Sequence, residues 1–145
     1  MKKKMGVIAL LALLLVGGTT NTYAADYKDK IFSFYVDTKA EITDSYTKYT
    51  DSSVYVHVTD GRTNYAKVQT WGYIDGKWVN KTIGTTASVP IGQYDSAKSR
   101  VRNLIVESNN NQATTMRLRF PINSEPTVVV GVWSPDCAGS YTYVN

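Results

Sequence analysis

The sequence predicts an all-β fold, an antiparallel β-sandwich or barrel that forms a single domain, and three observations support this prediction. Apolar and polar side chains alternate with a period of two in segments such as 32–36 and 54–58, as in half-buried strands. Turn-forming residues separate such segments at intervals of about ten residues. Only residues 93–103 have a pattern that would allow a helical turn, and no internal repeat or linker divides the chain.

The first 24 residues have the layout of a secretory signal peptide. Lysines at positions 2–4 precede an apolar run at 7–16, and the small residues Thr22 and Ala24 precede a cleavage position before Ala25. A membrane anchor is the alternative, but about ten apolar residues are far fewer than the roughly 20 that span a bilayer. We therefore expect segment 1–24 to be removed and domain 25–145 to be secreted, either free or associated with the cell wall.

The charge of the mature chain differs from that of the full sequence. The full chain has a formal net charge of +4, with 16 Lys and Arg against 12 Asp and Glu, and the first 24 residues contain three of the lysines and no acid. The remaining charge of +1 (13 minus 12) argues against nucleic acid as a partner. Cys137 is the single cysteine, so no intrachain disulfide can form, and we expect it to be a small, semi-buried residue.

Two strand segments allow detailed predictions. Val54, Val56 and Val58 should face the core, because alternate residues of a strand share one face. Asp75 and Gly76 lie between two aromatic runs and suit a tight two-residue hairpin turn, since both readily take positive φ.

The last apolar run, residues 127–134, predicts a central strand that is covered on both faces. Val129 and Trp133 should lie on one face, with Gly131 between them leaving room for a close approach of a neighbour. Pro135 cannot donate to a strand ladder, so the strand should end there and residues 140–144 should follow as an edge strand.

Residues 100–106 and 114–120 both have strand patterns, which predicts a hairpin with 108–112 as its loop. Pairing Ile105 with Met116 would give this hairpin an apolar face. Three successive asparagines suit the loop because Asn tolerates left-handed backbone and bonds its own backbone. A ligand role for these asparagines is the less favoured interpretation.

The sequence shows no catalytic constellation, and we expect a non-enzyme with no cofactor and no metal. His57 is the only histidine and Cys137 the only cysteine, which leaves neither a Ser-His-Asp triad nor a His/Cys metal cluster. A hydrolase that uses scattered carboxylates such as Glu107 and Glu125 is the remaining enzymatic alternative.

Aromatic side chains are numerous, with 11 tyrosines and three tryptophans. Such rings form binding surfaces, but they serve more often as cross-strand partners. If a binding surface exists, Trp71, Tyr73 and Trp78 around the predicted turn are its best candidates. Arginines on the solvent faces of two predicted strands would extend it towards anionic wall polymers or a lipid surface, and they are Arg100, Arg102, Arg117 and Arg119. A solvated face without a ligand is the alternative.

Several short motifs occur in an order that resembles a known group of proteins. They are Phe32-x-Phe34, TKYT at Thr47–Thr50, the strand of Trp71, ESNNN at Glu107–Asn111 and VVGVWSPD at Val129–Asp136. In this order the chain is similar to small exported Gram-positive proteins of undefined function that are associated with lactococcin-972-type bacteriocin and export loci. The resemblance implies a secreted protein and brings no established catalytic residues.

From these observations we expect a secreted, non-catalytic β-domain that acts in interbacterial competition, as a bacteriocin-like effector or as an accessory or protective factor. The alternative is a surface module that binds the cell wall or a glycan. The sequence indicates no oligomeric state.

Overall fold

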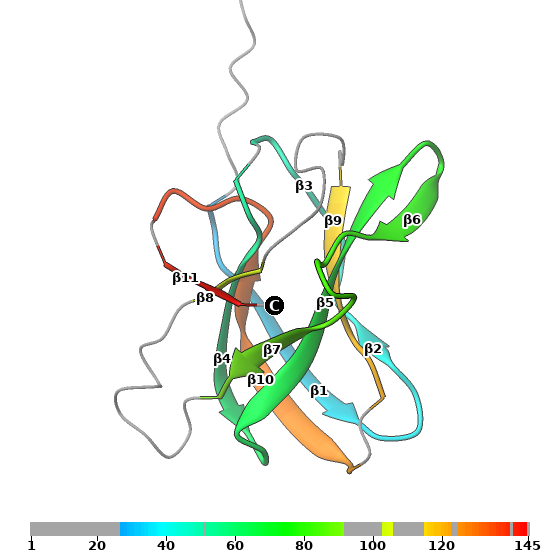
Figure 1. Cartoon of the computed structure of the whole chain (residues 1–145), viewed down its shortest axis with the longest axis vertical. Helices are drawn as coiled ribbons and strands as arrows, with labels where there is room; N and C mark the ends of the chain where they lie inside the picture. The colour runs from blue at the N-terminus through cyan, green and yellow to red at the C-terminus, as the bar shows by residue number, and fades with distance from the viewer. Residues whose placement is uncertain are drawn as a thin grey trace, which may run out of the picture.

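The computed structural model describes residues 27–50, 52–91, 103–105, 115–122, 125–139 and 141–144, and within them all regular structure is β-strand (Figure 1). The strands form two sheets that face each other. The first sheet contains five strands, in the spatial order β1 (Lys30–Val36), β10 (Thr127–Ser134), β4 (Tyr55–Gly61), β8 (Asn103–Ile105) and β11 (Thr142–Val144). The second contains β2 (Glu41–Ile42), β9 (Thr115–Phe120), β5 (Tyr65–Ile74) and β6 (Lys77–Asn80), with β3 (Tyr46–Thr47) also on β9 and β7 (Ala87–Pro90) also on β5. The predicted all-β fold is confirmed.

The long strand β5 curls the two sheets into a half-barrel. Its first part pairs with β7, and its second part pairs with β9 on one side and β6 on the other. Ile91, directly after β7, forms a parallel bridge to Val58 of β4 and so connects the second sheet to the first. On the opposite side of the sandwich, β1 pairs only with β10 among the described strands. The fold is therefore a sandwich that is joined along one side.

One hydrophobic core lies between the sheets, because each sheet turns its alternate apolar residues inward. The three valines Val54, Val56 and Val58 are fully buried in it, as predicted. The second sheet contributes Ala66 and Val68 of β5, Ala87 and Val89 of β7, and Met116, Leu118 and Phe120 of β9.

Strand β10 is central, as predicted, and lies between β1 and β4. Val129 and Trp133 are buried on its inner face, whereas Val128, Val130 and Val132 on its outer face are only half-buried. The prediction that the strand is covered on both faces is therefore wrong. An apolar run also arises when one face of a strand packs in the core and the other face carries valines, because β-branched residues favour strands even where no second layer covers them.

Gly131 allows the close approach that the sequence predicted. A Cβ atom at this position would lie 2.7 Å from Cζ of Phe32 and 3.0 Å from Cα of Val58, and it would collide with the carbonyl oxygen of His57. The pairing of β10 with β4 shifts register between Val130 and Gly131, so the glycine sits at a β-bulge.

The predicted turn at Asp75-Gly76 is confirmed. Both residues have positive φ, 49° and 78°, and they connect β5 to β6 with Tyr73 opposite Trp78. This hairpin extends past the rest of the second sheet at the upper right of Figure 1.

The predicted hairpin between 100–106 and 114–120 is wrong. Strand β8 belongs to the first sheet, where it pairs with β4 and, in parallel, with β11, so Ile105 lies beside Val144. Strand β9 belongs to the second sheet, and Met116 lies beside Gly72 and Tyr46. The alternation of apolar and polar residues identifies the buried face of each strand but not the strand with which it pairs. Because both sheets face the same core, strands of either sheet show the same alternation. The asparagines of the predicted loop lie outside the described residues.

Candidate functional site

Five of the seven predicted surface residues share the outer face of the second sheet. They come from the neighbouring strands β9, β5 and β6, and we call them the aromatic–arginine face: Trp71, Tyr73, Trp78, Arg117 and Arg119. The other two, Arg100 and Arg102, lie outside the described residues.

Strand alternation and register bring the five side chains together. In β9, Met116, Leu118 and Phe120 fill the core, so the arginines between them face outward. The odd-numbered residues at the end of β5 face outward in the same way. The register then sets Trp71 opposite Arg117 on one side of β5 and Tyr73 opposite Trp78 on the other.

Each arginine of this face lies over an indole ring. The guanidinium carbon of Arg117 is 3.8 Å from the ring centroid of Trp78, and that of Arg119 is 5.7 Å from the ring centroid of Trp71. Tyr73 contacts the Trp78 ring edge-to-face, with 5.3 Å between centroids. The planar guanidinium and the indole face attract each other through the ring quadrupole. The arrangement is thus two arginine–tryptophan pairs side by side.

A buried glutamine fixes one of these pairs. The side-chain oxygen of Gln69 accepts hydrogen bonds from Nε1 of Trp71 (3.0 Å) and from Nη1 of Arg119 (2.8 Å). The side-chain nitrogen of Gln69 donates to Oγ1 of Thr86 at 3.0 Å. Because Gln69 is buried and bonded at both ends, it holds the Trp71 ring and the Arg119 guanidinium in one orientation. The sequence did not reveal this role, although Gln69 is two residues before Trp71 and therefore on the same strand face.

The charge on this face is uncompensated within the described part of the chain. No carboxylate there lies within ion-pair distance of Arg117 or Arg119, and Nε of Arg117 is buried without an acceptor. Burial lowers the pKa of the Arg117 guanidinium below its usual value, and the neighbouring charge of Arg119 lowers it further. Arg117 nevertheless keeps its proton, because a guanidinium is not deprotonated in proteins. The face therefore presents two adjacent positive charges whose repulsion an anion would relieve.

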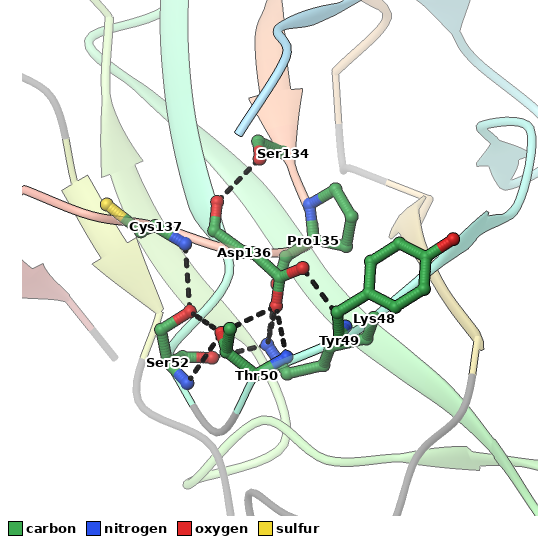
Figure 2. A network of polar contacts seen from close by, with 8 residues as sticks. All are labelled: Lys48, Tyr49, Thr50, Ser52, Ser134, Pro135, Asp136 and Cys137. Atoms are coloured by element: carbon green, nitrogen blue, oxygen red, sulfur yellow. Dashed lines mark hydrogen bonds and ion pairs between the residues drawn. The ribbon is translucent and has the colours of Figure 1, made fainter. Parts of the chain in front are cut away.

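A second polar assembly, which the sequence did not reveal, joins the segment after β3 to the segment after β10 (Figure 2). At its centre are Lys48 and Asp136, whose side chains are 1% and 0% exposed and whose Nζ and Oδ1 atoms are 3.8 Å apart. Nζ of Lys48 also donates to the carbonyl oxygens of Pro135 (2.5 Å) and Ser52.

The carboxylate of Asp136 binds the backbone of the opposite segment. Oδ2 accepts a hydrogen bond from the amide of Tyr49 (3.0 Å), and Oδ1 accepts one from the amide (2.9 Å) and one from the hydroxyl (2.7 Å) of Thr50. The amide of Cys137 donates to Oγ of Ser52 at 2.8 Å. These contacts, visible as dashed lines in Figure 2, satisfy backbone groups that two loops would otherwise leave buried without partners. We therefore assign the Lys48–Asp136 assembly to stability rather than to chemistry.

A pocket of about 340 Å³ lies beside this assembly, and its lining includes Tyr55, Asp136, Cys137 and Tyr141. Cys137 is free and half-buried, as the sequence predicted, and its thiol lies 3.5 Å from the carbonyl oxygen of Gly139. Among the described residues, no group of three or more His, Cys, Asp or Glu side chains is close enough to hold a metal ion.

The ranges that the structure describes contain no helical segment with the length and apolar character needed to cross a bilayer.

A sequence profile for a protein family matches residues 20–137, which is most of the chain and includes both the aromatic–arginine face and the Lys48–Asp136 assembly. The family is described as a protein of unknown function (DUF2712). The chain belongs to the DUF2712 family. Neither a curated protein nor a solved structure matches this DUF2712 protein. The family description names no activity.

Proposed function

We propose that the mature chain is an exported, non-catalytic β-domain that binds an anionic polymer of the bacterial surface through the aromatic–arginine face. The proposal rests on one observation, the two arginines that lie over tryptophan rings. Arg117 and Arg119 each lie over an indole ring and face outward, with no carboxylate partner in the described part of the chain. An anion supplies the missing partner of both.

A surface with no ligand would be expected to look different. Cross-strand neighbours of an exposed arginine are commonly acidic, because an opposite charge stabilises the pair and a like charge destabilises it. Here the strand neighbours of Arg117 and Arg119 on β5 are Trp71 and Gln69. Contacts between a cation and an exposed ring contribute only about 0.5–1 kcal/mol each. Arg117 is moreover partly desolvated without an acceptor for its Nε, which disfavours the empty face and favours an anion-bound one.

Export is supported by the first 24 residues, with their basic start, apolar run and small residues before Ala25. It has a direct test in the mass of the protein recovered from culture medium. That mass should correspond to a chain that begins at Ala25. A recovered chain that still begins at Met1 would contradict export by this route.

Polymer binding is tested by co-sedimentation with purified Gram-positive cell walls. We expect the mature protein to pellet with the walls and the double variant R117Q/R119Q to stay in the supernatant. The matched control is K28Q/R62Q, which also removes two positive charges, from exposed positions outside the strands of the second sheet. Its pelleting should equal that of the parent. Parent protein that remains in the supernatant, or a double variant that pellets as well as the parent, would remove the proposal.

A role in interbacterial competition is the second candidate, as an effector or as an accessory or protective factor. One observation favours it: two of the segments that carry the resemblance to bacteriocin-associated proteins, Thr47–Thr50 and Val129–Asp136, meet in the Lys48–Asp136 assembly. The test adds purified protein to related strains and deletes the gene in its producer. If the related strains grow normally with the protein and the producer grows normally without the gene, this role is excluded, and the proposal of polymer binding is unaffected.

A further inference from the structure

We propose that the polymer bound by the aromatic–arginine face is a phosphodiester polymer with one charge on every short repeat, such as a chain of glycerol phosphates. This inference rests on the proposed function and specifies its ligand. Arg117 and Arg119 would each contact one of two neighbouring phosphates along the chain.

The spacing of the two arginines favours closely repeated charges. Arg117 and Arg119 are two residues apart on the same face of β9, which places their Cα atoms about 7 Å apart. Burial and, to a smaller extent, the charge of Arg119 lower the pKa of the Arg117 guanidinium, which agrees with two guanidinium groups that lie close together. Phosphates separated by a single glycerol unit have a spacing of this order. The carboxylates of peptidoglycan lie on peptide branches, one branch per disaccharide, and are more widely spaced.

The hydrogen-bond donors that remain on the arginines suit a phosphodiester. One side-chain N–H of Arg119 is bonded to Gln69, and the side chain of Arg117 has no hydrogen bond to the described residues. The guanidinium fork can donate two parallel hydrogen bonds to the oxygens of one phosphate. The close contact of Arg117 with the Trp78 ring and the hydrogen bond of Arg119 to Gln69 orient the two forks before a ligand arrives, which reduces the entropy lost on binding.

The same stacking disfavours single-stranded nucleic acid, which also carries repeated phosphates. Proteins bind it by stacking its bases on open aromatic faces. Here one face of the Trp78 ring is covered by Arg117, and Tyr73 contacts the same ring. The two tryptophan rings of this face are thus occupied as supports for the arginines, and a polyol chain needs no open ring.

The experiment titrates the mature protein with soluble, deacylated poly(glycerol phosphate) and follows tryptophan fluorescence at several salt concentrations. Two phosphate contacts predict that the logarithm of the binding constant falls with the logarithm of the salt concentration, with a slope of about −1.4 if each contact releases counterions as in single-stranded nucleic acids. The variant R117Q/R119Q should lose at least tenfold in affinity and most of this slope, and K28Q/R62Q should retain both. Circular dichroism and thermal melts of each variant show whether a loss of binding is caused by a loss of folding. The single variants R117Q and R119Q should have affinities between those of the parent and the double variant, because each still contacts one of the two phosphates.

Three comparison ligands separate the outcomes. Poly-glutamate, oligo(dT) and vesicles containing phosphatidylglycerol should each bind at least tenfold more weakly than poly(glycerol phosphate). Equal, arginine-dependent binding of poly-glutamate would overturn the phosphodiester inference and leave surface-polymer binding intact. Tighter binding of oligo(dT) or of vesicles would overturn both the phosphodiester inference and surface-polymer binding, and would identify nucleic acid or lipid as the ligand. An absence of binding to all four, with no pelleting on cell walls, would remove the proposed function itself.

Discussion

Among single residues, Trp133 and Trp78 have opposite environments although both lie in strands of the same fold. Trp133 is 0% exposed, packs in the core and contacts Tyr46 edge-to-face at 5.8 Å. Trp78 is half-buried on the outer face of the second sheet, where it lies under Arg117. The stability of the domain should therefore depend far more on the first ring than on the second.

Trp133→Ala should lower the free energy of unfolding by roughly 3–5 kcal/mol, the range for deleting a buried ring and leaving a cavity. Trp78→Ala should cost much less, because its ring loses little contact with the core and solvent can fill the space. Chemical denaturation of the two variants measures the difference. Equal destabilisation would show that Trp78 belongs to the core and would remove it from the proposed binding face.

At the level of elements, the Lys48–Asp136 assembly connects the segment between β3 and β4 to the end of β10. The contact is buried on both sides, and Asp136 also accepts three hydrogen bonds from Tyr49 and Thr50. Breaking a buried ion pair by removing one partner commonly costs about 3–5 kcal/mol, because the other charge stays buried without compensation.

We expect Asp136→Ala and Lys48→Met each to destabilise the domain by about 3–5 kcal/mol. The double variant should cost less than the sum of the two, because it leaves no isolated buried charge. Chemical denaturation of the parent, both single variants and the double variant gives this double-mutant cycle. Additive effects would mean that the two side chains act independently, and the assembly would then not be the connection that we describe.

The whole molecule is held together by one core between two sheets, with Cys137 free. A domain of about 120 residues can bury enough apolar surface to fold without a disulfide. We therefore expect reducing agent to leave the melting temperature unchanged. The measurement is a thermal melt with and without reductant at two protein concentrations. A large decrease on reduction would reveal a bridge between two copies through Cys137.

Local patterns in the sequence determined the class of fold and most of the candidate face. The alternation in β4, the Asp75-Gly76 turn and the buried position of Trp133 depend on neighbours within a few residues, so the sequence predicted them correctly. Trp71 and Tyr73 could be assigned to one face of β5 by the same alternation. The structure adds that this face is the outer one, because Ala66 and Val68 earlier in the strand fill the core.

Only the tertiary structure decided which strands are neighbours. Strand β9 pairs with β5 rather than with β8, and this pairing is what sets Arg117 opposite Trp71 and within reach of Trp78. The contact between Lys48 and Asp136 could not be predicted from the sequence either, because nothing in the sequence near a lysine or an aspartate identifies a partner that is far away along the chain. The physical reason is the same in both cases: side-chain periodicity reports which face of a strand is buried, whereas the choice of partner depends on how the whole set of strands covers one shared core.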